Sequence, residues 1–290
     1  MDQITVLVTG VNGFIGRHLL NHLTKNAKFK IIGLQRSGDD SDTYTQSSLI
    51  RLFQVHKPSV VVHLASNTSR SRDFKVMPVM LEGNVGLTTR LLEAARISAV
   101  PTKFIFLSSA EVYGPKEGMV RETDELKPVS PYGISKVMCE ELFDIYFRNF
   151  GIHTHILRLF NCFGPGQARG FFISDLVHAF HAKQPLEMTE GMQKRDFLYI
   201  TDVVRAIEIF ILRPPIFEII NLSSGKLISL KEITALANMI VAPEHIEILN
   251  HLPYRPFEIW EMYGNNDRLK LAGMNEMEDF NVSLSAYLSE

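Results

Sequence analysis

Short apolar runs alternate with longer segments of helical periodicity through most of the first 225 residues, and this alternation constrains the fold more than any other feature. The runs are rich in β-branched or aromatic side chains, as strands buried on both faces are; they occupy residues 4–9, 30–35, 59–65, 103–108, 153–160 and 216–222. In the segments between them, apolar residues recur at intervals of three and four; these segments are residues 14–25, 47–56, 85–99, 132–150 and 202–212. The repetition predicts an α/β fold, a Rossmann-type doubly wound parallel sheet with helices on both faces.

A second, smaller domain interrupts this pattern. The alternation of predicted strands and helices becomes less regular after Phe163, where "GPGQARG" is rich in glycine and proline, and again after Gly225. We therefore expect a Rossmann domain from residues 1–163 plus 193–226, and an α/β cap from residues 164–192 plus 227–290. Such a cap would lie over the carboxyl ends of the strands, where open α/β sheets bind ligands.

The composition excludes several classes of function. The chain is 46% apolar and 21% charged, and its net charge of −2 gives no reason to expect nucleic acid as a partner. Cys139 and Cys162 are too few and too far apart for a disulfide framework or a zinc site, and no metal site is expected. No signal-type segment and no apolar run of ~18 residues occurs. We expect a cytoplasmic protein with no membrane partner.

A glycine-rich turn, "TGVNGFIG", follows the first predicted strand and opens the first predicted helix. Gly10 permits a tight turn, Gly13 allows the backbone to approach a pyrophosphate, and Gly16 lets helix pack close to strand. In this context the turn indicates dinucleotide binding rather than an ordinary loop. The candidate cofactor contacts in it are Gly10, Asn12, Gly13, Phe14, Ile15 and Gly16.

The end of the second predicted strand indicates which dinucleotide is bound. Sites that prefer NAD(H) usually place an acid there for the ribose hydroxyls, whereas an arginine accommodates a 2′-phosphate. Gln35 occupies the acid position and Arg36 follows it. NADP(H) is therefore favoured over NAD(H), the alternative being that Arg36 is simply solvated.

"YGISK" places Tyr132 and Lys136 four residues apart, hence on one face of a helix. A tyrosine is a poor acid–base catalyst at neutral pH, but a close ammonium and a positive nicotinamide ring favour its phenolate. Any exposed helix can carry this pair by chance. With the glycine turn upstream and the serine-containing strand end "LSSAEVYG" between them, the pair indicates proton transfer.

Seven motifs together resemble the extended short-chain dehydrogenase/reductase family of NAD(P)-dependent nucleotide-sugar epimerases, dehydratases and reductases, over essentially the whole chain. They are "TGVNGFIG", "HLAS", "GNVGLT", "LSSAEVYG", "PYGISK", "RLFNCFGPGQ" and "RDFLYITDV".

The resemblance implies three catalytic residues. Ser109 would hydrogen-bond the reacting oxygen, Tyr132 would exchange its proton, and Lys136 would hold the nicotinamide ribose and lower the pKa of the tyrosine. Asn84 would support the site and contribute to cofactor binding, unless it is an amide satisfied on a helix surface. Leu64, Ala65 and Ser66 would line the cofactor cleft.

The resemblance also implies a nucleoside diphosphate sugar as substrate. Arg195 and Arg255 would clamp the diphosphate, Glu258 would accept from the nucleotide ribose, and Asn161 would face the diphosphate or the sugar. Surface ion pairs are the alternative for the arginines. The strings "RPFEI", "MYGNNDRLK" and "FNCFGPGQARGFFISDL" are most similar to GDP-4-keto-6-deoxy-mannose reductases, so GDP is the expected nucleotide.

The chain departs from the family after the second predicted strand. Another strand, ending in an Asp-containing signature that meets adenine, normally follows there, but this chain has only "SDTYTQ". Asp42 is the candidate replacement for that acid.

The residues after Ser109 indicate which reaction is possible. Dehydrating relatives carry an Asp-Glu pair there, whereas this chain has Ala110 and Glu111, so dehydration lacks its general acid. Epimerising reductases of the GDP-fucose synthase type carry a cysteine directly after the serine, where this chain has Ala110. We therefore expect NADPH-dependent reduction of a C4 ketone, with Glu111 as a structural acid or a sugar-hydroxyl acceptor. The alternatives are a 4-epimerase with retained NAD and a non-catalytic cofactor-binding protein.

Two long helices, residues 80–99 and 131–150, resemble the pair that forms a four-helix dimer interface in this family. A homodimer is therefore expected, with the second helix buried on more than one face. The apolar residues that indicate this burial are Leu142, Phe143, Ile145, Tyr146 and Phe147.

Overall fold

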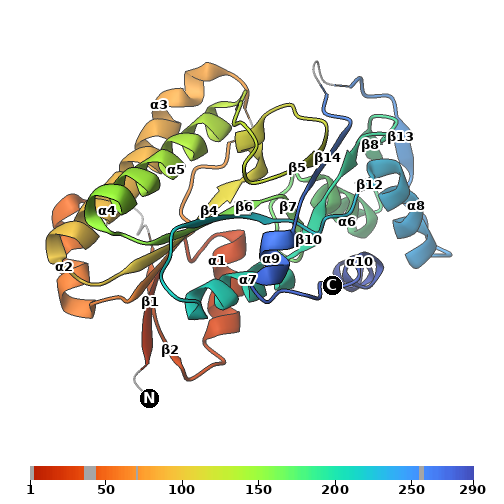
Figure 1. Cartoon of the computed structure of the whole chain (residues 1–290). Helices are drawn as coiled ribbons and strands as arrows, with labels where there is room; N and C mark the ends of the chain where they lie inside the picture. Colours follow the sequence, from red (N-terminus) through yellow and green to blue (C-terminus); the bar gives the residue numbers. More distant parts are fainter. Residues whose placement is uncertain (1–2, 36–43, 70, 255–257) are drawn as a thin grey trace. The chain divides into compact units, whose positions relative to one another are not determined.

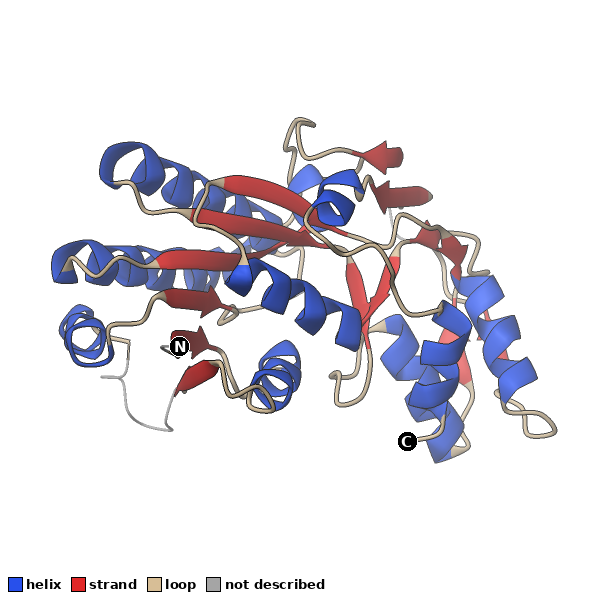
Figure 2. Cartoon of the chain, turned by 60° about the horizontal axis from the view of Figure 1, so that its bottom comes forward, coloured by secondary structure: helices blue, strands red, loops and turns tan. Residues whose placement is uncertain are grey.

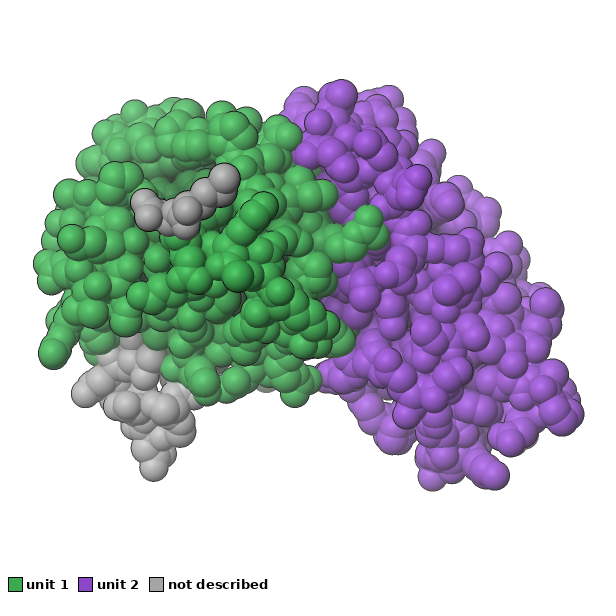
Figure 3. All heavy atoms as spheres, turned by 90° about the horizontal axis from the view of Figure 1, so that it is seen from below, with its two compact units in different colours: residues 1–114, 125–158, 204–220 green, residues 115–124, 159–203, 221–290 purple. Residues whose placement is uncertain are grey.

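The computed structural model describes residues 3–35, 44–69, 71–254 and 258–290, which form two compact units (Figure 3). The first unit contains residues 1–114, 125–158 and 204–220, and the second contains residues 115–124, 159–203 and 221–290.

The division differs from the one expected from the sequence. Residues 115–124, 159–163, 193–203 and 221–226 group with the second unit rather than with the Rossmann domain. The pairing of short strands explains part of the difference, because β7 (Asn161–Phe163) hydrogen-bonds in parallel to β10 (Phe197–Tyr199) within the second unit. Strands of this length carry too few residues to show a period.

The six predicted apolar runs all form strands of one parallel sheet, which confirms the predicted fold class. Its strands are β1 (Ile4–Thr9), β2 (Phe29–Leu34), β3 (Val60–His63), β4 (Lys103–Ser109), β6 (Thr154–Leu159) and β11 (Glu218–Leu222). Their order is β11-β6-β4-β3-β1-β2, so β1 lies between β3 and β2. Leu7 in β1 is therefore level with Ile32 on one side and Val61 on the other.

The five predicted helices also form, and they cover both faces of the sheet. They are α1 (Phe14–Leu23), α2 (Gln46–His56), α4 (Leu87–Ser98), α5 (Pro131–Phe150) and α7 (Ile200–Leu212). Figure 1 shows α2, α4 and α5 on one face, and α1 and α7 on the other; Figure 2 shows the same helices from a different side. On the α1 side, His22 and Glu208 form a hydrogen bond of 2.6 Å between the two helices.

Aromatic side chains fill the core between the sheet and α5. The ring of Phe143 lies 4.9 Å from that of Phe106 and 5.5 Å from that of Phe104, between ring centroids. The hydroxyl of Ser130 caps the start of α5 by accepting from the Gly133 amide at 3.0 Å. These contacts fix where α5 begins and which face it turns to the sheet.

Short segments lead into α4 and α5. A 3-10 turn (Phe74–Val76), α3 (Met77–Met80) and a π-helical turn η2 (Leu81–Gly86) precede α4, and a 3-10 turn (Ala110–Tyr113) follows β4. Among the described residues, no helix is long and apolar enough to cross a membrane.

The second unit combines small sheets with helices, as expected for an α/β cap. Its four-stranded sheet has the order β12-β9-β14-β5; the strands are β5 (Gly118–Val120), β9 (Lys194–Arg195), β12 (Ile228–Ser229) and β14 (Glu261–Gly264). Another pair joins β8 (Leu186–Met188) to β13 (Ile248–Asn250). The helices are α6 (Phe172–Ala182), α8 (Leu230–Ile240), α9 (Asp267–Leu271) and α10 (Phe280–Leu288).

A buried ion pair joins α5 to β6 in the first unit. Arg158 Nη2 donates to Glu140 Oε2 at 2.7 Å, and the two side chains are 3% and 4% exposed. Ser108 also donates to Glu140, and Arg158 donates to the Tyr113 hydroxyl at 3.0 Å. Burial acts to lower the pKa of the Arg158 guanidinium, but the hydrogen bond and charge of Glu140 outweigh it and raise that pKa.

We predict that Glu140→Gln lowers the free energy of unfolding by about 3–5 kcal/mol, because it leaves the buried Arg158 cation without its counter-charge. Asp144→Asn is the matched control on the same helix, since Asp144 pairs with Arg148 at an exposed site and should cost less than about 1 kcal/mol. Urea denaturation of both variants measures the difference. Equal losses of unfolding free energy would contradict the role of Glu140 as the counter-charge of a buried Arg158.

Candidate active site

The glycine turn adopts the close packing predicted for it. Gly10 has φ +73°, and a Cβ there would lie 2.7 Å from the Ala65 backbone nitrogen. A Cβ on Gly16 would lie 2.2 Å from the Gly10 carbonyl oxygen, which itself accepts from the Gly13 amide at 3.0 Å. A side chain at Gly10 would therefore push the turn away from the segment after β3, and one at Gly16 would push α1 away from the turn.

A cleft of about 1000 Å³ opens beside this turn, entirely within the first unit. It is lined by Gly10, Val11, Asn12, Gly13, Leu34, Gln35, Tyr44, Thr45, Leu64, Ala65, Ser66, Asn67, Pro78, Val79, Glu82, Gly83, Leu87 and Arg90. The glycine turn, the end of β2 and the segment after β3 thus meet at one cleft. These residues fit a dinucleotide, because backbone that no Cβ obstructs borders a helix N-terminus.

Some predicted cofactor residues do not line the cleft. Phe14, Ile15 and Gly16 belong to the first turn of α1, and Asn84 lies behind the cleft wall. Arg36 and Asp42 lie outside the described residues.

Several lining residues were missed from the sequence, among them Tyr44, Thr45, Asn67, Glu82 and Arg90. The position of Thr45 at the start of α2 was the only signal that pointed to any of them.

A directed chain of hydrogen bonds runs behind the cleft from β1 to α4. The Ala65 amide donates to Thr9 Oγ1 at 3.1 Å, and the Thr9 hydroxyl donates to His63 Nδ1 at 2.8 Å. His63 Nε2 then donates to Thr88 Oγ1 at 3.1 Å, and Thr88 donates to the Asn84 carbonyl at 2.8 Å. Burial, and next the charge of Lys136, lower the pKa of His63 to about 3, so its imidazole stays neutral as this chain requires.

Asn84 is a buried positioning residue rather than a helix-surface amide. It is 2% exposed, and its Oδ1 accepts from the Asn67 amide at 2.6 Å. Its Nδ2 lies 3.1 Å from the Asn67 carbonyl and 2.9 Å from Ser135 Oγ, which in turn donates to the Tyr132 carbonyl at 2.8 Å. Asn84 therefore joins the cleft wall to the first turn of α5.

Tyr132 and Lys136 lie on the same face of α5. Lys136 is 3% exposed; its Nζ donates to the Leu107 carbonyl at 2.8 Å and lies 5.6 Å from the centroid of the Tyr132 ring. Burial lowers the pKa of Lys136 to about 8. The ammonium is thus held at the end of β4 beside the tyrosine.

The net effect of the protein's own groups on the pKa of Tyr132 is opposite to the predicted lowering. Burial raises the pKa of the Tyr132 phenol, the charge of Glu111 raises it further, and the Ser109 hydroxyl opposes them without reversing the direction. Desolvation of the phenolate is the largest contribution to this shift. Tyr132 is therefore a neutral phenol through the neutral pH range.

The two serines of "LSSAEVYG" have different partners. Ser108 is 2% exposed and donates to Glu140, whereas Ser109 Oγ accepts from the Glu111 amide at 3.2 Å at the start of the 3-10 turn. Ala110 is buried, and the Glu111 carboxylate accepts from Ser130 Oγ at 2.5 Å. This bond ties Glu111 to the cap of α5.

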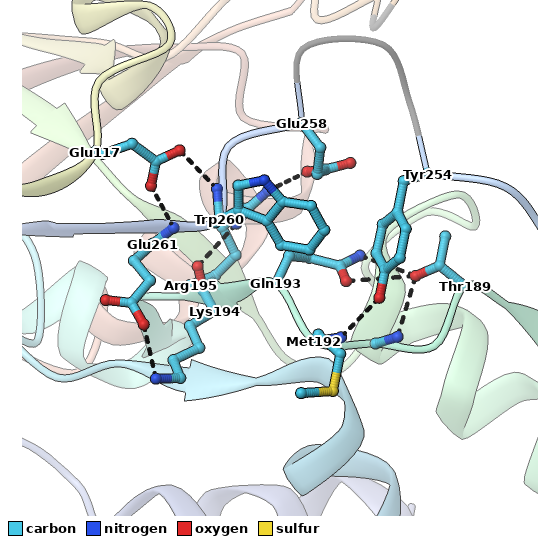
Figure 4. A network of polar contacts seen from close by, with 11 residues as sticks. Glu117, Thr189, Met192, Gln193, Lys194, Arg195, Tyr254, Glu258, Trp260 and Glu261 are labelled. Atoms are coloured by element: carbon cyan, nitrogen blue, oxygen red, sulfur yellow. Dashed lines mark hydrogen bonds and ion pairs between the residues drawn. The ribbon is translucent and has the colours of Figure 1, made fainter.

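In the second unit, Arg195 and Glu258 form an ion pair (Figure 4). Arg195 Nη2 lies 2.5 Å from Glu258 Oε1, and the side chains are 18% and 14% exposed, so this is not a surface pair. Arg255 lies outside the described residues. Asn161 Nδ2 donates to the Asp196 carbonyl at 2.9 Å.

The strands around this pair are held by Glu117 and Asp196, neither of which the sequence analysis singled out. Glu117 accepts from the backbone amides of Trp260 and Glu261, both at 2.8 Å (Figure 4). Asp196 is fully buried and accepts from the backbone of Ser224, Gly225 and Gly264. Its place in "RDFLYITDV" was the available signal.

Within the described ranges, no three His, Cys, Asp or Glu side chains gather so that they could hold a metal ion.

The parallel sheet, the glycine turn with its cleft, and the nearby serine, tyrosine and lysine define a Rossmann-type dinucleotide-binding enzyme. The chain belongs to the NAD dependent epimerase/dehydratase family, whose sequence pattern matches residues 6–223. It is thus an NAD(P)-dependent enzyme that modifies nucleotide sugars.

Three relatives illustrate the range of this family. YtcB of Bacillus subtilis (strain 168), an uncharacterized UDP-glucose epimerase, is 31% identical over 254 residues that span 80% of each chain. RMD from Pseudomonas aeruginosa, solved in complex with NADPH, is 27% identical with a TM-score of 0.88, covering 99% of this chain and 98% of its own. UDP-glucuronic acid 4-epimerase from Bacillus cereus, solved with UDP-glucuronic acid and NAD, is 27% identical with a TM-score of 0.81, covering 98% of each chain.

We predict that Gly10→Ala weakens binding of the dinucleotide at least about tenfold, because the new methyl group must displace the Ala65 backbone that borders the cleft. Gly151→Ala is the matched control, since Gly151 has φ +67° but nothing within 4 Å of the added Cβ. Fluorescence titration with NADPH and NADH measures the effect. Equal affinities in the two variants would show that the close approach at Gly10 does not matter for binding.

Proposed function

We propose that the protein is an NADPH-dependent reductase that converts the C4 ketone of a nucleoside diphosphate 4-keto-6-deoxy sugar to an alcohol, with GDP as the nucleotide. The observation that carries this proposal is the grouping of Ser109, Tyr132 and Lys136 next to Ala110. It supplies the groups needed for hydride transfer and omits the second acid needed for elimination. The similarity to RMD, which was solved with NADPH, supports the choice of cofactor.

The environment of Ala110 and Glu111 argues against dehydration. The methyl group of Ala110 is buried and carries no proton to transfer. Glu111, the neighbouring acid, has its carboxylate bonded to Ser130 at the start of α5. Its place at the helix cap favours the structural role over that of a sugar-hydroxyl acceptor.

The protonated state of Tyr132 is the one that a proton donor needs. Reduction needs a neutral phenol that gives its proton to the ketone oxygen, and burial keeps the phenol neutral. NADPH supplies the hydride when bound. Ser109 orients the same oxygen, and Lys136 holds the ribose of the nicotinamide while its charge stabilises the phenolate left after proton transfer.

The proposal assigns the cofactor and the substrate nucleotide to different units. In this proposal the first unit binds NADP(H), while the second binds the nucleotide of the substrate through Arg195, Arg255, Glu258 and Asn161. An arginine fork bonds two oxygens of a diphosphate at once, which a lysine cannot do with the same geometry.

A homodimer through α4 and α5 is also part of the proposal. Phe143 and Tyr146 pack into the core, and Phe147 stacks on Phe217 with 5.0 Å between ring centroids. Exposed apolar side chains remain on these helices at Ile97, Met138, Ile145 and Phe150. They would form the contact surface.

A 4-epimerase with retained NAD is the second candidate, because relatives of that kind are equally similar to the chain. YtcB and the Bacillus cereus enzyme carry the name of epimerase. The same three residues serve both reactions, since an epimerase passes through a transient ketone. A dinucleotide that copurifies tightly, together with sugar interconversion without net NADPH consumption, would support this candidate instead.

We predict that the protein oxidises NADPH when a GDP-4-keto-6-deoxyhexose is added, and that Tyr132→Phe lowers this rate by about 10²–10⁴-fold with nearly unchanged NADPH affinity. Tyr146→Phe is the matched control: Tyr146 lies on the same helix as Tyr132, its hydroxyl bonds to Glu93 of α4, and the variant should keep its activity. Absorbance of the nicotinamide follows the reaction. Absence of substrate-dependent oxidation would refute the reductase, and full activity in Tyr132→Phe would remove Tyr132 from the mechanism.

We also predict that kcat/KM for reduction is constant across the neutral range and falls as pH rises above about 8. The pKa of Lys136 is lowered to about 8, so its ammonium is present below that pH and lost above it, while Tyr132 stays protonated. Initial rates and NADPH dissociation constants between pH 6 and about 10 test this. A rate that is independent of pH to the upper limit would contradict it.

A further inference from the structure

Charge is scarce in the cofactor cleft. Among the described residues that line it, Glu82 is the one acid and Arg90 the one base. The end of β2, where an acid often accepts from ribose hydroxyls, carries Gln35, whose Oε1 accepts from Asn12 Nδ2 at 3.1 Å. Within the described cleft, Glu82 and Arg90 are thus the charged side chains that can recognise a charged group on the cofactor.

Glu82 and Arg90 form an ion pair across Gly86. Arg90 Nη2 lies 3.0 Å from Glu82 Oε1. A Cβ at Gly86 would lie 3.3 Å from Glu82 Oε2 and 3.4 Å from Arg90 Nη1, so the glycine leaves room for the pair. Glu82 is in the π-helical turn and Arg90 in α4, and helical side chains lean toward the N-terminus, which lets Arg90 reach back to the turn.

The pair satisfies Arg90 incompletely. Arg90 Nε is buried and finds no hydrogen-bond partner among the residues that the structure describes. The Arg90 side chain is 28% exposed, whereas that of Glu82 is 74% exposed and can turn into water. A buried donor without a partner is costly, and an anion with several acceptor oxygens would satisfy Nε and a terminal nitrogen together. A phosphate fits this requirement better than the single carboxylate contact.

The backbone of Arg90 adjoins the adenosine side of the cleft. Gln46 Nε2 donates to the Arg90 carbonyl at 3.2 Å, and Gln46 is the first residue of α2. Thr45 and Tyr44, which precede it, line the cleft, and the Tyr44 hydroxyl donates to the Leu34 carbonyl at 3.4 Å at the end of β2. In dinucleotide folds the end of the second strand meets the adenosine ribose.

We propose that Arg90 selects NADP(H) over NAD(H) by exchanging the carboxylate of Glu82 for the 2′-phosphate on the adenosine ribose. This inference rests on the proposed use of NADPH. The exchange forms no covalent bond: Glu82 turns into water, and the guanidinium donates to the phosphate oxygens from Nε and a terminal nitrogen. Glu82 then acts as the competitor that the 2′-phosphate must displace.

The test uses 2′-phospho-ADP-ribose and ADP-ribose, which differ only in that phosphate, titrated calorimetrically into the whole protein. We expect the wild type to bind the phosphorylated fragment more tightly, and Arg90→Met to reduce its affinity by about tenfold to hundredfold with ADP-ribose nearly unchanged. Arg96→Met is the matched control, because Arg96 lies on the same helix, pairs with Glu93 at 2.8 Å and does not line the cleft. It should leave the affinity ratio unchanged.

A second variant separates phosphate binding from a loss of structure. Glu82→Gln should tighten binding of 2′-phospho-ADP-ribose by about twofold to tenfold, because Arg90 no longer has to leave a carboxylate. Equal weakening of both fragments in Arg90→Met would place the contact on their shared part and overturn the proposal. A preserved preference in Arg90→Met, lost instead in Arg36→Met, would also overturn it.

The fragments lack nicotinamide, so their binding does not depend on turnover or on the sugar substrate. If the wild type prefers the phosphorylated fragment and Arg90→Met keeps that preference, the role of Arg90 is refuted and the proposed use of NADPH stands. A wild type without any preference refutes both the inference and the NADPH part of the proposed function.

Discussion

The neutral imidazole of His63 is the interaction on which the arrangement of the first unit depends. It accepts from Thr9 on one side and donates to Thr88 on the other, and Thr88 continues to the backbone of Asn84. The chain has one direction, because Thr88 donates its hydroxyl hydrogen to the Asn84 carbonyl and therefore accepts from His63 Nε2, which leaves Nδ1 of the neutral imidazole as an acceptor. A protonated imidazole could not accept from Thr9, so the burial that keeps His63 neutral also keeps the glycine turn, β3 and α4 in register.

Patterns between residues close in sequence predicted the strands and helices of the first unit, because such residues determine the backbone conformation. Continuous apolar runs, helical periods and the spacing of Tyr132 and Lys136 each express a backbone geometry, and the structure confirms the six strands and five helices derived from them. The contacts of Ser108 with Glu140 and of Asn84 with Ser135 were beyond such reasoning. Their partners are 32 and 51 residues away in sequence, and only the packing of α5 on its neighbours brings them together.

The second unit was predicted less well because its order comes from single side chains rather than from periodicity. The strands β9 and β12 contain two residues each, too few for an alternating pattern. Asp196 supplies the missing constraint: its carboxylate gathers amides from two separate segments, Ser224–Gly225 and Gly264, at one buried point. Burial removes the Asp196 carboxylate from water and raises its pKa to about 6, although the hydrogen bonds themselves act to lower that pKa.

The described arginines proposed to meet phosphate, Arg90 and Arg195, are each paired with a carboxylate of the same unit. A chain with a net charge of −2 offers an anionic ligand little general attraction, so binding must come from individual guanidinium groups. The paired glutamate keeps each partly buried guanidinium from lacking a counter-charge. An anionic ligand must also bind the guanidinium more tightly than the glutamate does, which disfavours weaker anions. The two pairs differ in exposure: Glu82 is 74% exposed, whereas Glu258 is 14% exposed. Glu82 can therefore leave its arginine at low cost, while Glu258 has to stay and contribute to the same polar site.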